Sequence, residues 1–193
     1  QADRQGEAIP ILKEVIRKDP SSKLAYRKLA ENSIAIDNLE GAATAYEELF
    51  NIDPRDIKVA INISDVYLDN NDFRQAIKWA DKASSLDNKN ADALGQKGKV
   101  YYYGWENFRQ NPFTNDDRIV AKLAYNYFVK AVDKGYRGFE KINWMKENEK
   151  DILYGRAQWF MAIDKVKRSR VISTTTSEYE WVNENLKAES GWK

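Results

Sequence analysis

Small alanines recur at a fixed interval inside amphipathic stretches of the first half of the chain. Ala8, Ala42 and Ala76 are 34 residues apart, and larger apolar or aromatic residues follow each of them at matching offsets. Spacings of three and four residues place these side chains on one stripe of a helix, where the alanines let two backbones approach closely. A period of this length predicts a unit of two antiparallel helices.

Each predicted unit contains two apolar stripes with turn-forming residues between them. In residues 23–56 the stripes consist of Tyr26, Leu29, Ala30, Ser33, Leu39, Ala42, Tyr46 and Leu49. Asp37-Asn38 lies between the two stripes, and Pro54 ends the unit. Residues 57–90 repeat the pattern without a gap. Residues 1–22 contain only the second stripe, which predicts a partial repeat.

The unit at residues 91–137 departs from the period. Its second-helix alanine, Ala124, follows Ala76 by 48 residues, so an insertion at roughly 104–119 separates its two helices. We expect a lengthened first helix, then a loop, then a capping box formed by Thr114 and Asp117. The insertion carries Trp105, Phe108 and Phe113. These rings either pack back on the solenoid or form an aromatic patch that binds a partner.

The last third of the chain matches the period poorly. Residues 138–170 are expected to form a degenerate unit of two capping helices, because terminal repeats must cover the open end of a stacked core. Residues 171–193 are predicted to be a linker and a short helix, with Ser177 and Glu180 as its capping box. That helix packs against the capping helices or docks in a groove. Of the 24 aromatic residues, 18 follow position 100, which indicates a bulkier capping core or an aromatic pocket.

The 34-residue period, the small–large pattern and the Asp53-Pro54 ending resemble tetratricopeptide repeats across roughly residues 5–135. This resemblance implies an all-α, right-handed solenoid of antiparallel helix pairs with atypical C-terminal capping helices. In this family the first helix of each pair lines the concave face, which binds protein segments. The residues that the resemblance places on this face are Arg27, Lys28, Glu31, Lys58, Ile61, Asn62, Asp65, Asp69, Asp92, Gln96, Lys99 and Tyr103.

Composition argues against most enzymatic roles. The chain has neither histidine nor cysteine, so it lacks the commonest general base, the thiolate nucleophile and the commonest metal ligands. Its 31 basic and 30 acidic residues provide no long-range field that would attract nucleic acid or an anionic membrane. No apolar run is long enough to span a bilayer. We therefore expect no catalytic, cofactor or metal site, no nucleic-acid partner and no membrane insertion.

One local cluster of cations stands out, formed by Lys165, Lys167, Arg168 and Arg170. Cations at the C-terminus of a helix interact favourably with its dipole, which is the structural interpretation. The alternative interpretation is contact with acidic partners or phosphates.

The leading functional hypothesis is a non-catalytic scaffold or adaptor that binds a peptide or helix of another protein in its concave groove. The groove residues include four bases and four acids, so the partner should not be strongly acidic. Two alternatives remain: a self-assembling structural element, hence a homo-oligomer, and the helical appendage of an enzyme. The start at Gln1 suggests that an upstream segment was removed. A soluble chain of this kind fits the cytoplasm as well as a periplasmic or secreted location.

Overall fold

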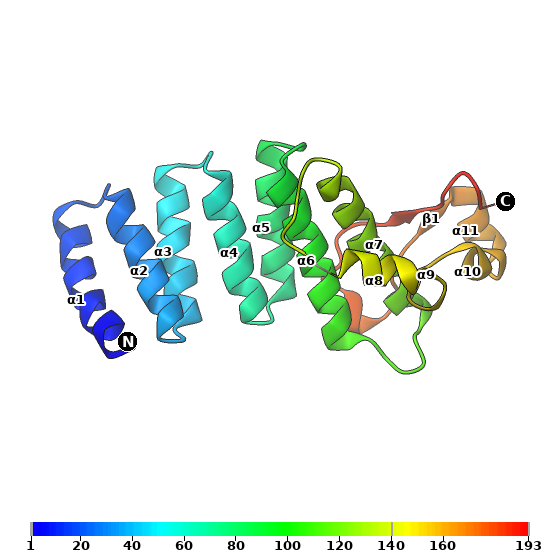
Figure 1. Ribbon diagram of the computed structural model, residues 1–193, viewed down its shortest axis with the longest axis horizontal. Helices are drawn as coiled ribbons and strands as arrows, with labels where there is room; N and C mark the ends of the chain where they lie inside the picture. The colour runs from blue at the N-terminus through cyan, green and yellow to red at the C-terminus, as the bar shows by residue number, and fades with distance from the viewer. Residues whose placement is uncertain (1, 140, 193) are drawn as a thin grey trace. The chain divides into compact units, whose positions relative to one another are not determined.

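The computed structural model describes residues 2–139 and 141–192 and divides the chain into two compact units. Unit 1 comprises residues 1–87 and unit 2 residues 88–193. Both units are built mainly from helices that pack in sequence order (Figure 1). The predicted all-α solenoid of helix pairs is confirmed.

Unit 1 contains five helices, each packed against the next. They are α1 (Ala2–Lys18), α2 (Lys23–Ala35), α3 (Leu39–Ile52), α4 (Ile57–Asp69) and α5 (Phe73–Leu86). Side-chain caps explain why α3, α4 and α5 begin where they do. Asn38, Asp56 and Asp72 each accept a hydrogen bond from the backbone N–H three residues later, at 3.0–3.1 Å. The chain reverses at Asp37 and Asn71, which have φ values of 61° and 56°.

The small residues of the period lie where helices approach most closely. Ala42 and Ala76 are completely buried, whereas Ala8 in α1 is half-buried. Phe50 of α3 meets Trp79 of α5 edge to face, with ring centroids 5.1 Å apart. The core of unit 1 is thus a row of alanines flanked by larger apolar side chains, as expected for stacked helix pairs.

Unit 2 begins with two long helices, α6 (Ala91–Phe108) and α7 (Asn115–Val132), joined by a loop. The expected lengthened helix, loop and capping box are confirmed. Thr114 Oγ1 accepts from the Asp117 amide at 3.1 Å, and Asp117 Oδ2 accepts from the Thr114 amide at 2.7 Å. Glycines in α6 allow close packing: a Cβ at Gly98 would lie 2.7 Å from the Phe128 ring of α7.

The prediction of two capping helices in residues 138–170 is wrong. The structure has four short helices there: α8 (Ile142–Glu147), α9 (Glu149–Ile152), α10 (Arg156–Phe160) and α11 (Asp164–Ser169). The backbone is extended at Leu153 and Gly155, between α9 and α10. There the Tyr154 amide donates to the carbonyl of Arg118 in α7 at 2.9 Å. A hydrogen bond to α7 therefore replaces one that would have continued the helix.

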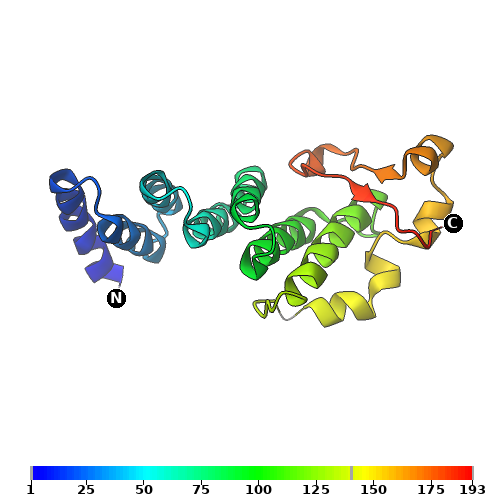
Figure 2. The ribbon, with the colours of Figure 1, turned by 90° about the horizontal axis from the view of Figure 1, so that it is seen from above.

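The predicted C-terminal helix is also wrong. Strand β1 (Val171–Ile172) pairs antiparallel with β2 (Leu186–Lys187), and a single 3₁₀ turn, η1 (Ser177–Tyr179), lies between them. β2 lies against α7 (Figure 2). Tyr179, at the end of η1, and Trp181, just after it, are both buried. The expected capping box is absent too, because the Ser177 hydroxyl donates to Glu178 instead.

The predicted linker is held against unit 2 rather than free. The backbone amides of Thr175 and Thr176 donate to Asp116 Oδ2 at 2.6 and 2.8 Å. Asp116 is itself buried at the start of α7. We call residues 171–192 the C-terminal strap, because they cross the α6–α7 pair in extended form and contact both helices.

Candidate functional site

Four of the predicted concave-face residues act on the pKa of one tyrosine in unit 1. Arg27 and Glu31 lie on α2, Asn62 and Asp65 lie on α4, and all four influence the hydroxyl of Tyr46 from α3. Tyr46 is buried, and burial is the main cause of its raised pKa. The negative charges of Glu31 and Asp65 raise this pKa further, while Arg27 and a hydrogen bond with Asn62 oppose the increase.

We call this group the Tyr46 cluster. Its side chains come from α2 and α4, the first helices of two successive pairs, and from the second helix α3, and we call the concave surface predicted here the valley. Arg27, Asn62 and Asp65 are half-buried and Glu31 is exposed, so their polar ends remain accessible. The half-buried amide of Asn62, which lies among charges of both signs, can hydrogen-bond the backbone and polar side chains of a peptide.

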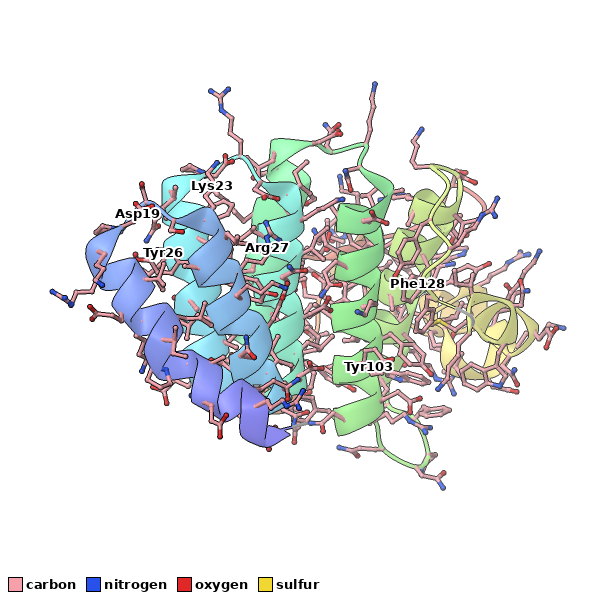
Figure 3. The ribbon with its side chains drawn as sticks, turned by 60° about the vertical axis from the view of Figure 1, so that its left-hand side comes forward. Asp19, Lys23, Tyr26, Arg27, Tyr103 and Phe128 are labelled. Carbon is pink, nitrogen blue, oxygen red and sulfur yellow. The ribbon has the colours of Figure 1, made fainter. Side chains whose placement is uncertain are left out.

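The other residues predicted for the valley in unit 1 are mostly exposed. Lys28, Lys58 and Asp69 are exposed, and Ile61 is half-buried. Figure 3 shows Lys23, Tyr26 and Arg27 along α2. Arg27 interacts with Asp56, the N-cap of α4, at 3.5 Å, and Lys28 pairs with Glu31 at 2.7 Å. The first of these contacts links α2 to the start of α4, so Arg27 has a structural role as well.

The four predicted residues of unit 2 differ in accessibility. Asp92 and Tyr103 are exposed and Lys99 is half-buried, but Gln96 has only 2% of its surface exposed. A side chain this buried cannot contact a partner, which corrects the expectation for Gln96. Burial comes from the tight packing of α6, where even Gly95 is in contact with the ring of Tyr136.

The aromatic rings of the insertion pack within unit 2. Trp105 is completely buried, with its ring 5.8 Å from that of Phe113 and 5.6 Å from that of Tyr102. Phe108 is half-buried and meets Tyr179 of the strap edge to face at 6.0 Å. These contacts favour back-packing over a sticky patch. For Trp105 the expectation of a partner-binding surface is therefore corrected.

Sequence reasoning missed a hollow of about 380 Å³ in unit 1, between α1, α2 and α3. Tyr26 and Leu29 of α2 form part of its apolar lining, and Lys13, Glu40 and Glu48 provide charges. The hollow opens between two second helices, so it lies on the other side of α2 from the Tyr46 cluster. The repeat pattern alone does not predict this hollow, because the hollow depends on how α1 packs against α2.

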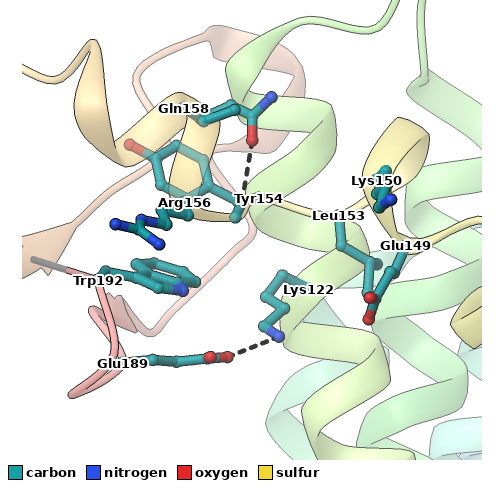
Figure 4. Close-up of a pocket in the computed structure, with 11 residues that line it drawn as sticks. Lys122, Glu149, Lys150, Leu153, Tyr154, Arg156, Gln158, Glu189 and Trp192 are labelled. Carbon is teal, nitrogen blue, oxygen red and sulfur yellow. Dashed lines mark hydrogen bonds and ion pairs between the residues drawn. The ribbon is translucent and has the colours of Figure 1, made fainter.

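A second recess, of about 410 Å³, lies in unit 2 (Figure 4). Tyr154 and Trp192 contribute buried rings to it. Its rim holds an ion pair between Lys122 and Glu189 at 2.7 Å, and the Gln158 side chain accepts from the Gly155 amide at 3.0 Å. The lining comes from α7, from residues 149–158 and from the end of the strap. No sequence motif joins segments so far apart in the chain.

Three polar groups tie the strap to the long helices of unit 2. The carboxylate of Glu184 accepts from the hydroxyls of Tyr101 and Tyr127 at 2.8 and 2.9 Å. Lys97 lies 3.4 Å from the same carboxylate and 4.4 Å from the Tyr127 ring centroid. Lys97 thus balances the charge of Glu184 inside unit 2.

Titration of Tyr127 should make the stability of unit 2 depend on pH. Burial raises its pKa from 10.0 to about 12; Glu184 adds to the increase, and Lys97 opposes it. A raised folded-state pKa gives stabilisation that is complete below about pH 10 and is lost as the pH rises toward 12. We expect wild type to lose more free energy of unfolding than Tyr127→Phe between pH 9 and 11, as measured by urea denaturation at about five pH values. Lys97 and Lys130 also face this ring, and equal losses in the two proteins would contradict the prediction.

The cations singled out in the sequence divide into two kinds. Arg170 donates to the carbonyls of Ala188 and Glu189 at 3.2 and 2.6 Å, and its guanidinium lies over the Trp159 ring. It therefore fastens the end of the strap. Lys167 donates to the Phe160 carbonyl at 2.8 Å. Lys165 and Arg168 form no ion pair within the described part of the chain.

Comparison with known proteins supports the assignment of the fold but shows neither a family nor a function. No protein-family model matches the chain, and no curated protein does. Among solved structures, the MamA RS-1 ArsTM double mutant is similar over 86% of both chains, with a TM-score of 0.56 and 16% sequence identity. Within residues 2–139 and 141–192, no helix has the length and apolar character needed to cross a membrane. The chain is therefore an all-helical repeat protein whose architecture is compatible with tetratricopeptide-like repeats.

Proposed function

We propose that this chain is a non-catalytic scaffold that binds a peptide or helix of another protein in the valley between α2 and α4. The observation that carries the proposal is the Tyr46 cluster. Four side chains from two first helices act on the pKa of one phenol, and all come from positions at which this repeat pattern is expected to present binding residues.

The chemistry of the valley indicates what kind of segment it accepts. Its predicted contact residues in unit 1 comprise three cations and three carboxylates, beside Ile61 and Asn62. Mixed charges at this density favour a segment that carries both signs and disfavour a strongly acidic tail. The half-buried Ile61 provides a place for one apolar side chain. An affinity around micromolar, equivalent to about 8 kcal/mol, is typical of such a small contact surface.

Charge reversal at the valley edges tests this proposal. Lys28→Glu with Lys58→Glu changes two exposed cations and leaves the Arg27–Asp56 contact intact. We expect the double variant to lose its captured partner from a lysate of the source cells, or to bind it at least about tenfold more weakly, because repulsion replaces attraction across the contact. Quantitative mass spectrometry followed by titration of the recovered peptide measures the effect.

The matched control is Lys78→Glu with Lys82→Glu on α5, which has the same charge change on exposed positions of a second helix. Both variants should retain the helical circular dichroism of wild type. A partner that is lost from the valley variant and kept by the control supports the proposal. If all three proteins captured the same partners equally, the valley would not be the binding site.

A further inference from the structure

Three large apolar side chains stand out from the surface at one turn of unit 2. Phe160, Met161 and Ile163 connect α10 to α11 and expose 72%, 81% and 68% of their surfaces. We call them the apolar tip. Side chains in a flat patch shield one another, so exposures this high mean that each projects into solvent. Both views place α10 and α11 at the end of unit 2 farthest from α6 (Figures 1 and 2).

Basic residues precede and follow the apolar tip in the sequence. Residues 155–170 contain Arg156, Lys165, Lys167, Arg168 and Arg170 against a single carboxylate, Asp164, which gives a local charge of +4. Lys167 Nζ lies 5.7 Å from the centroid of the exposed Phe160 ring. Helix α11 has six residues and is about 9 Å long, so its cations lie within about one Debye length of the tip.

Most of these cations remain available for an external anion. Within residues 2–139 and 141–192, Arg156, Lys165 and Arg168 form no ion pair, and Lys167 donates only to a backbone carbonyl. Arg170 is the exception, because it fastens the strap. Glu189, a carboxylate of the strap, is already paired with Lys122.

We propose that this turn binds the surface of an anionic lipid bilayer, with the apolar tip inserted among the lipids and the surrounding cations at the headgroups. Long Lys and Arg side chains can extend their charges to the headgroup level while their methylenes remain beside the inserted tip. Apolar insertion and attraction to anionic lipid reinforce each other, and neither alone holds a protein firmly. This surface is separate from the valley in unit 1, so the two proposals stand independently.

The shape of the tip favours a bilayer over a protein partner. A protein must offer a preformed pocket for each projecting side chain, together with carboxylates placed to match the cations. A fluid bilayer adapts to three neighbouring apolar side chains and supplies anions in any lateral arrangement. The net charge of the whole chain, +1, does not reveal this surface, because the charges elsewhere cancel it.

Vesicle flotation of the full chain tests the proposal. We expect binding to phosphatidylcholine vesicles that contain about one third phosphatidylserine, and little binding to phosphatidylcholine alone or at high salt. Lys165→Gln with Arg168→Gln should weaken binding about tenfold. Phe160→Ser, Met161→Ser and Ile163→Ser together should weaken it by about as much or more.

Matched controls separate this surface from general effects. Lys134→Gln with Lys146→Gln removes two other exposed cations of unit 2, and Ile11→Ser with Leu24→Ser removes two apolar side chains exposed by 66% and 68% in unit 1. Both should bind vesicles as wild type does. Equal losses in the control and tip variants would overturn the proposal, as would equal binding to neutral and anionic vesicles.

A fluorescence measurement reports insertion directly. The chain has no cysteine, so Met161→Cys provides a unique site for an environment-sensitive dye. Its emission should shift to the blue with anionic vesicles and be quenched by spin-labelled lipid, whereas a dye at Ile11→Cys should not respond. An unchanged spectrum with anionic vesicles would refute insertion, and an acidic protein with apolar pockets would then be the better match for the tip.

Discussion

Removal of the C-terminal strap, residues 171–193, is expected to unfold unit 2 at room temperature. The strap buries five large side chains: Ile172, Tyr179, Trp181, Leu186 and Trp192, each exposed by 7% or less. Burying a side chain of this size stabilises a protein by about 1.5–3 kcal/mol. Their sum, even after the entropy of ordering the strap is subtracted, rivals the total stability of an ordinary domain, about 5–15 kcal/mol.

Polar groups add to the loss, because the strap donates hydrogen bonds to two buried carboxylates of α7. Asp116 would lose two backbone donors and Asp117 would lose the Tyr179 hydroxyl, although both carboxylates are buried. Gly104 shows how close the contact is: a Cβ there would lie 2.2 Å from the Trp181 ring. The strap thus acts as part of the core of unit 2.

Hydrogen exchange measures this effect element by element. Amides of α6 and α7 should lose protection in the truncated chain, while those of α2–α5 in unit 1 serve as the internal reference. A peptide of residues 171–193 added in trans should restore protection if the strap acts through its contacts. Lys187→Ala, a change at an exposed strap position, is the matched control. Native protection of α6 and α7 without the strap would contradict the prediction.

Asp117→Ala is expected to destabilise unit 2 by about 3 kcal/mol, the second-largest effect we anticipate. The carboxylate of Asp117 is 1% exposed and accepts four hydrogen bonds. Its donors are the Tyr179 hydroxyl at 2.6 Å, the Thr114 amide and hydroxyl at 2.7 and 2.8 Å, and the Gln110 amide at 3.2 Å. Removing it leaves the buried Tyr179 hydroxyl and the half-buried Thr114 donors without this acceptor, and it removes one half of the capping box of α7.

Urea denaturation compares this variant with two others. Asp133→Ala removes an exposed carboxylate from the C-terminal end of the same helix and should change stability by no more than about 0.5 kcal/mol. Tyr179→Phe removes one of the four donors and should cost less than Asp117→Ala, about 1.5–3 kcal/mol. A cost for Asp117→Ala no greater than that of Asp133→Ala would show that this hydrogen-bond network is unimportant for stability.

The local sequence pattern predicted the helix pairs of unit 1, because such patterns depend on neighbouring residues. Ala42 and Ala76 are completely buried in the structure, and Asn38, Asp56 and Asp72 cap the helices that follow them. Helical periodicity and capping depend on residues within about four positions of one another. The same locality explains why the Thr114–Asp117 capping box was predictable.

Site residues were predictable only in part. The repeat pattern predicts that Arg27, Glu31, Asn62 and Asp65 share one face, and all four act on the pKa of Tyr46. It also placed Gln96 on that face, although Gln96 is buried in unit 2. Where the repeat is regular, the position of a residue within the repeat predicts whether its side chain is exposed. Near the insertion, added aromatic side chains change the packing, and the repeat no longer predicts which side chains are accessible.

The sequence by itself therefore determined the number, bounds and pairing of the first helices, because these follow from short-range periodicity and turn chemistry. Tertiary structure alone decided the shape of residues 138–192. There the helices are short and the rest of the backbone is not helical, so that Tyr154 can bond Arg118, the Thr175 amide can bond Asp116 and Trp181 can pack on Gly104. Contacts between residues about 35–80 positions apart outweigh a helical propensity worth only tenths of a kcal/mol per residue.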